Sequence, residues 1–232
     1  MILERLRRAT SIALTIGVVI FPSYAGAQQG SAELLAFVNT LYIHGLPIAE
    51  AQARFDVSDV PDLLALLDDP VEEKYLRNIV LMLGLVGDER ATAALINLLD
   101  TAPAGPITHG RFKGLSLALP ALGFLAGRGD ADARQFLIAR ADPSAWSGNR
   151  LRWTLATAPT DYLPHYMAKM AIQGLSTAST PEADAVLQDL QSRVESGALP
   201  DHYRNDVSDA IGRSKRIKQS GVGAAFRRAD GN

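Results

Sequence analysis

The sequence predicts an all-α fold, an α-solenoid of about four helix pairs preceded by an N-terminal helical cap. Four segments repeat one order: a short helix-like stretch, a break, and a longer helix-like stretch with a glycine near its end. The glycines are Gly84, Gly123, Gly174 and Gly212, at intervals of 39, 51 and 38 residues. Helix-pair repeats commonly recur every ~40–47 residues. Because no segment alternates apolar and polar residues as a strand does, we expect almost no sheet.

The first residues are typical of a secretory signal peptide. Arg5, Arg7 and Arg8 precede an apolar run over residues 12–21, and a small-residue motif ends at Ala27. This order predicts a signal peptide over residues 1–27, cleaved after Ala27. The alternative is an uncleaved anchor, but the run is shorter than the ~20 residues that span a bilayer. We therefore expect an exported protein, periplasmic or secreted, with no integral membrane span after cleavage.

Residues 28–57 are expected to form the N-terminal helical cap. One amphipathic helix is predicted around Leu34, Val38 and Tyr42, and a second over residues 48–55. A solenoid needs such a cover because its first repeat otherwise exposes an apolar face.

The repeat domain is predicted over residues 58–220. In its first unit, Leu76, Ile79 and Leu83 follow helical spacing. A glycine inside a helix costs about 1 kcal/mol relative to alanine. Its recurrence at Gly84, Gly123 and Gly174 therefore predicts close helix–helix approach at these positions. The breaks carry residues suited to cap the following helices, namely Asp88, Asp130 and Thr180.

Three stretches of the first unit carry a family resemblance. Residues 60–70, 75–79 and 83–88 resemble a HEAT repeat of the type also found in phycobilisome-lyase-like proteins. The resemblance covers residues 58–220 and weakens toward the end of that range. It implies an α-solenoid. It does not imply lyase activity, because a fold alone does not assign a function.

The composition argues against several functional classes. The chain has no Cys, and His44, His109, His165 and His202 are scattered singly, so no metal site or cofactor is predicted. The motifs of metalloproteases, serine hydrolases and phosphate-binding loops are absent. The net charge is −2 overall, +2 over residues 1–27 and +5 over residues 213–232, which leaves −9 for residues 28–212. An acidic body excludes a nucleic-acid partner.

Basic and aromatic residues near the start of each long helix form the strongest candidate binding site. Stacked repeats place equivalent positions along one ridge, and planar aromatic and guanidinium groups are favoured in recognition. The ridge predicts an unidentified protein partner. In the alternative reading, the arginines pair with acidic neighbours and the aromatic rings fill grooves between repeats. The candidate partner-binding residues are Tyr75, Arg77, Arg111, Lys113, Arg150, Arg152, Trp153, Tyr203 and Arg204.

The sequence thus favours an exported binding or scaffold module that mediates protein–protein interaction without catalysis. One alternative is a hydrolase-like enzyme that uses an insertion at residues 142–165, with His165, Asp161 and His109 as acid–base groups. Another is a structural protein that self-associates through an exposed apolar end repeat. Residues 221–232 are expected to form a flexible basic tail.

Overall fold

The computed structural model describes residues 25–43, 45–147, 151–159 and 162–226. Within these residues the protein is all-α, with eleven α-helices and two strands of two residues each. This confirms the predicted all-α class and the near absence of sheet. The basic start and apolar run of the predicted signal peptide lie outside the described residues. None of the described helices is long and apolar enough to cross a membrane.

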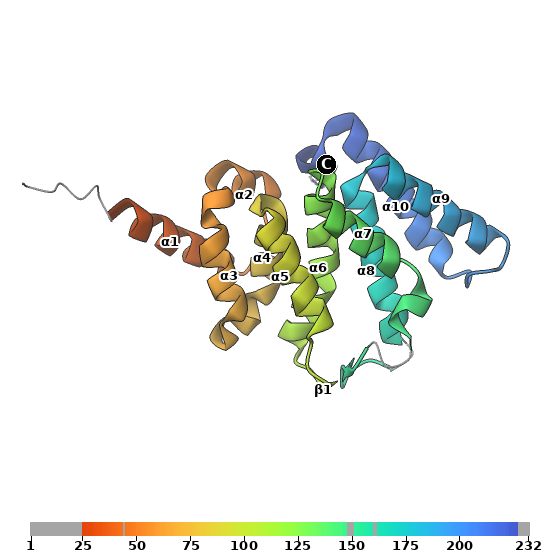
Figure 1. The fold of residues 1–232 in the computed structure, drawn as a ribbon, viewed down its shortest axis with the longest axis horizontal. Helices are drawn as coiled ribbons and strands as arrows, with labels where there is room; N and C mark the ends of the chain where they lie inside the picture. The colour runs from red at the N-terminus through yellow and green to blue at the C-terminus, as the bar shows by residue number, and fades with distance from the viewer. Residues whose placement is uncertain (1–24, 44, 148–150, 160–161, 227–232) are drawn as a thin grey trace, which may run out of the picture.

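The expected cap region forms two helices, α1 (Ala25–Val38) and α2 (Ile48–Arg54), which both contact α4 (Leu76–Val86). The buried Asn78 of α4 ties this region to the rest of the chain. Its side-chain amide donates to the carbonyl of Val38 at 2.7 Å and to that of Thr40 at 3.0 Å. Figure 1 shows α1 at one end of the molecule, with the remaining helices following one another toward α9.

The helices after the cap form two rows, in which each helix contacts the next member of its own row. The two rows alternate along the chain, so that helices from successive sequence units lie next to one another. The first row consists of α3 (Val60–Asp68), α5 (Glu89–Asp100), α7 (Ala131–Arg140) and α9 (Pro181–Glu195). The second row consists of α4, α6 (His109–Gly127), α8 (Tyr162–Ala178) and α10 (Tyr203–Ser220). Short 3-10 helices, η1 (Val57–Asp59), η2 (Pro70–Tyr75) and η3 (Pro143–Trp146), lie in the connections.

The predicted close approach at the recurring glycines is confirmed. A Cβ atom on Gly123 would lie 2.3 Å from the carbonyl oxygen of Gly174, and one on Gly84 would lie 2.7 Å from the Cα of Ala121. Backbone therefore meets backbone between α4 and α6 and between α6 and α8. Gly212 of α10 differs, because its nearest neighbour would be the Arg216 guanidinium at 3.5 Å.

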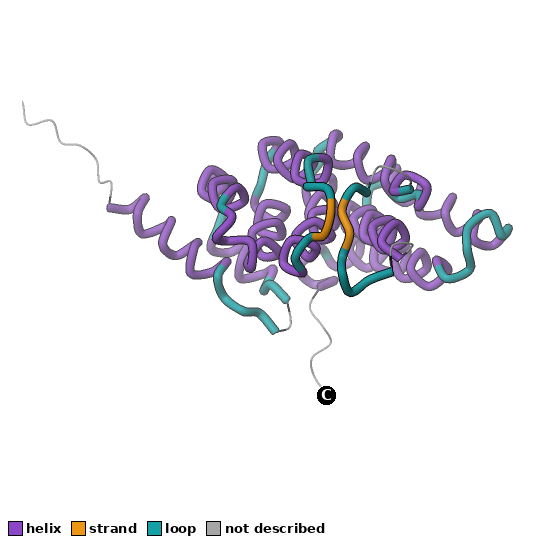
Figure 2. The backbone as a smooth tube through the Cα atoms, turned by 90° about the horizontal axis from the view of Figure 1, so that it is seen from below, coloured by secondary structure: helices purple, strands orange, loops and turns teal. Residues whose placement is uncertain are grey.

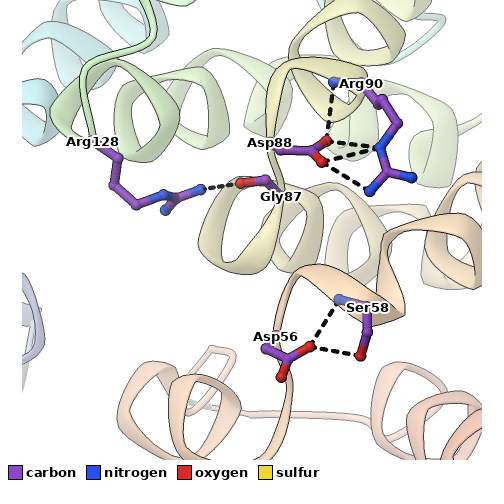
Figure 3. A network of polar contacts seen from close by, with 6 residues as sticks. All are labelled: Asp56, Ser58, Gly87, Asp88, Arg90 and Arg128. Atoms are coloured by element: carbon purple, nitrogen blue, oxygen red, sulfur yellow. Dashed lines mark hydrogen bonds and ion pairs between the residues drawn. The ribbon is translucent and has the colours of Figure 1, made fainter.

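The predicted N-caps are confirmed as well. Asp88 accepts a hydrogen bond from the backbone N–H of Arg90 at 3.0 Å, as Figure 3 shows. Asp130 and Thr180 likewise accept from backbone N–H groups in the first turns of α7 and α9. The second carboxylate oxygen of Asp130 accepts from the hydroxyl of Thr92 at 2.6 Å, so this cap also links α5 to α7.

Arg128, which follows α6, caps the end of α4. Its guanidinium donates to the carbonyl of Leu85 at 2.9 Å and to that of Gly87 at 2.7 Å; Figure 3 shows the contact with Gly87. Carbonyl groups at a helix C-terminus lack intrahelical partners and attract cations. Partial burial lowers the pKa of Arg128 from its ordinary value.

The predicted insertion folds back onto an earlier loop. Strand β1 (Gly105–Pro106), before α6, pairs in parallel with β2 (Trp153–Thr154) in the insertion. The amides of Gly105 and Ile107 each donate at 2.9 Å to carbonyls of the later segment. Figure 2 shows the two strands side by side. This pairing holds the insertion beside the start of α6.

Part of the expected C-terminal tail is helical. Helix α11 (Val222–Phe226) contacts both α10 and α2, and Val222 packs against the core. This part of the predicted tail is therefore packed onto the domain, whereas residues 227–232 lie outside the described residues.

Candidate binding site

Of the nine candidate partner-binding residues, three are exposed, namely Lys113, Arg152 and Arg204, and Tyr75 is half-buried. Arg204 is held by a neighbour, since its guanidinium lies 2.5 Å from a carboxylate oxygen of Asp201. These residues come from η2, α6, α10 and the insertion, and their arrangement as one binding surface stays a prediction.

Two other candidates lie inside the protein. The side chains of Trp153 and Tyr203 are only 4% and 1% exposed. Trp153 packs with its ring centroid 6.0 Å from that of Phe112. Both residues support the surface from beneath, which matches the alternative in which the aromatic rings fill grooves. Arg150 lies outside the described residues.

Arg77 and Arg111 are half-buried, and the Nε atom of each is buried without a hydrogen-bond partner among the described residues. Arg111 lines a cavity of about 280 Å³ together with Asp68 of α3 and Asn97 of α5. The Arg111 side chain thus reaches the first row of helices.

Aromatic rings from α6, β2 and α8 form a connected group. The ring of Phe112 contacts those of Trp153 and Tyr166, with centroids 6.0 and 5.2 Å apart, respectively. Tyr166 in turn lies 5.7 Å from Tyr162. His109, at the first position of α6, lies 6.3 Å from Phe112. The start of α6 is thereby joined to the start of α8 by ring contacts.

This group leads to a pocket between α8 and the start of α10, with a volume of about 520 Å³. Four of its lining residues follow helical spacing along one face of α8, since residues three and four apart lie next to each other on a helix. Three more come from the start of α10, and Pro159 completes the lining. The α8 residues are Tyr162, His165, Tyr166 and Lys169, and the others are Tyr203 and Asp206 of α10 and His202, which directly precedes α10. We call this cavity the α8–α10 pocket.

The base of the α8–α10 pocket holds a hydrogen bond between His165 and Tyr203. The Nδ1 atom of His165 lies 2.6 Å from the hydroxyl oxygen of Tyr203. Burial raises the pKa of Tyr203 far above its ordinary value. Which of the two groups donates this hydrogen bond depends on the imidazole tautomer. The ring of His202 packs against both, with centroids 4.9 and 4.6 Å away.

An ion pair borders the same pocket. The Nζ atom of Lys169 lies 2.7 Å from a carboxylate oxygen of Asp206. The pocket therefore offers aromatic rings beside a compensated pair of charges, which suits binding of a polar ligand with an apolar face. Among the described residues, no group of three or more carboxylate or imidazole side chains is placed to hold a metal ion.

The acid–base hypothesis for the insertion gains no direct contact from the structure. His165 touches Tyr203 and His202, whereas His109 packs on Phe112. Within the described part of the chain, no hydrogen bond or ring contact joins His165 to His109. Asp161 lies outside the described residues, so that hypothesis stays a prediction.

Part of the α8–α10 pocket was predicted from the sequence, since Tyr162 and His165 belong to the predicted insertion and Tyr203 to the predicted ridge. Tyr166, Lys169 and Asp206 were not among the predicted site residues. The spacing of the α8 residues was a usable signal, because it puts four polar or aromatic side chains on one helix face.

The comparisons with known proteins give no family. Neither protein-family models, nor curated proteins, nor solved structures match this chain. The resemblance to HEAT repeats thus rests on the residues quoted above.

Proposed function

We propose that the protein is an exported α-solenoid of HEAT-like helix pairs that binds another protein and does not catalyse a reaction. The main support is the order of helix contacts. Helices α4, α6, α8 and α10 contact one another in sequence, as do α3, α5, α7 and α9. Stacked repeats produce this pattern because each unit buries its apolar face only against its neighbours. The signal-like sequence of residues 1–27 supports export.

The proposed protein-binding face consists of Tyr75, Lys113, Arg152 and Arg204, the accessible members of the predicted ridge. The ring of Tyr75 is flanked by Lys74, whose Nζ lies 4.7 Å from its centroid. Tyrosine and arginine are enriched among residues that dominate protein–protein affinity. The basic groups on an otherwise acidic body favour a partner with an acidic surface.

Capture from the exported fraction of the source cell tests this face. The bait is the mature chain, compared with a Tyr75→Ala plus Lys113→Glu variant and with a Gln135→Ala plus Gln188→Ala control at exposed positions of the first row. We expect wild type and control to retain the same protein and the face variant to lose it. Equal recovery by all three, with circular dichroism showing each to be folded, would contradict the proposed face.

N-terminal sequencing of the protein from the exported fraction tests export separately. The proposal predicts a mature chain that begins at Gln28, after cleavage behind Ala27. A chain that retains residues 1–27, or that is absent from the exported fraction, would contradict it.

Self-association is a second candidate because two apolar side chains near the cap are strongly exposed. Leu41 and Ile43 are 81% and 86% exposed. Light scattering across a range of concentrations tests this candidate, which predicts a mass that rises with concentration and falls again in a Leu41→Ser plus Ile43→Ser variant.

A further inference from the structure

The geometry points to the α8–α10 pocket as a binding site for a neutral sugar ring. This inference goes beyond the proposed protein partner, since none of the accessible face residues Tyr75, Lys113, Arg152 and Arg204 lines the pocket. Its three supports are an accessible aromatic ring, a compensated set of charges and a suitable size.

The accessible ring is that of Tyr162. Its side chain is 49% exposed, and it is held by Tyr166, whose ring centroid lies 5.7 Å away. Tyr166 is itself packed against the buried Phe112, at 5.2 Å. A ring supported on one side and open on the other can stack against a flat ligand with little loss of conformational entropy. The C–H face of a sugar ring is such a surface.

The charges of the pocket favour a ligand without net charge. Lys169 and Asp206, the two oppositely charged side chains that line the pocket, neutralise each other at 2.7 Å. An anion would be attracted by Lys169 but repelled by Asp206, and a cation would be attracted by Asp206 but repelled by Lys169. A carboxylate and an ammonium still accept and donate further hydrogen bonds, and such bonds are stronger than those between neutral groups. Sugar hydroxyls supply both donors and acceptors.

A purely aromatic ligand fits this pocket less well. It would stack on Tyr162 but would cover Lys169 and Asp206 without replacing their hydrogen bonds to water, which costs free energy. By contrast, the hydroxyl groups of a sugar ring can replace these hydrogen bonds to water. The volume of about 520 Å³ lies within the range of ~300–1,000 Å³ that is typical of small-molecule sites.

Saturation-transfer NMR and calorimetry with maltotriose, cellotriose and triacetylchitotriose test the proposal on the mature chain. We expect saturable binding of at least one of them. Tyr162→Ala should weaken that binding about tenfold, because it removes the stacking ring. Tyr162→Phe should keep it, and Asp206→Asn should weaken it by removing a charged acceptor. The control Gln135→Ala, at an exposed position of α7 outside both proposed sites, should bind as wild type does.

Three outcomes would overturn the proposal. The first is the absence of binding of all three saccharides to the folded protein. The second is saccharide binding that Tyr162→Ala leaves unchanged. The third is binding of adenosine or free tryptophan in place of the saccharides. The protein-capture experiment is run with Tyr162→Ala as well, because retention of the captured protein by this variant separates failure of the sugar site from failure of the proposed protein-binding face.

Discussion

Replacing Gly123 by alanine tests how tightly α6 and α8 pack. The added Cβ would lie 2.3 Å from the carbonyl oxygen of Gly174 and 2.9 Å from its Cα. Favourable contacts between carbon atoms occur at ~3.5–4.0 Å, so the two backbones must separate. Overpacking of this kind costs ~1–3 kcal/mol. Alanine also gains about 1 kcal/mol over glycine within a helix, which offsets part of that cost.

Gly212→Ala is the matched control. It gives the same gain in helix propensity, but its Cβ would meet only the flexible end of Arg216, at 3.5 Å. The difference in unfolding free energy between the two variants therefore isolates the packing cost, about 1–3 kcal/mol. Urea unfolding followed by circular dichroism measures it. If Gly123→Ala is stabilised as much as Gly212→Ala, the reasoning about close approach is refuted.

Three further predictions concern polar contacts. Arg128→Met should lower the free energy of unfolding by ~1–2 kcal/mol, because the end of α4 loses two hydrogen bonds from a charged group. The control Arg90→Met removes an exposed ion pair in the same region and should change the free energy of unfolding little. Burial acts to raise the pKa of Asp142, but hydrogen bonds from Ser144 and Arg193 outweigh it and hold that pKa below 3.8. The stability that these bonds give is therefore present above about pH 4 and is lost on further acidification. Arg193→Met should make the free energy of unfolding, measured with urea, depend less on pH below about pH 4. Burial raises the pKa of Tyr203 above 10.0, so the contribution of this residue to stability is present below pH 10 and is lost as the pH rises further. In an ultraviolet titration one tyrosine should ionise after the others, and this last ionisation should be missing from Tyr203→Phe.

Local signals in the sequence were sufficient to predict the repeated helices and the N-caps of three of them, although not the C-terminal helix α11. The caps at Asp88, Asp130 and Thr180 depend on residues within one turn, so they can be read directly from the chain. The glycines at positions 84 and 123 were equally informative, because a costly residue recurring inside helices needs a packing reason.

The candidate site depended on contacts between distant segments, which the sequence does not display. Tyr203 bonds His165, 38 residues earlier, and Trp153 is buried by pairing of its strand with Gly105. Tyrosine and tryptophan occur both at binding surfaces and in packed grooves, so residue type alone did not decide between the two readings. The position of Arg111 could not be predicted either, because its side chain reaches helices of the first row, and that contact follows from how the helices pack.

The central claim is that helices from successive sequence units pack directly against one another, and an engineered disulfide tests it. The chain has no native cysteine, and the hydroxyl oxygens of Ser179 and Ser214 lie 3.1 Å apart although the residues are 35 positions apart. A Ser179→Cys plus Ser214→Cys variant should lose both free thiols on mild oxidation while it keeps its helical circular dichroism, because this separation allows a disulfide. A Ser179→Cys plus Ser208→Cys control, displaced along α10 by ~9 Å, should keep its thiols. Free thiols in the first variant, or equal crosslinking of both, would contradict the claim.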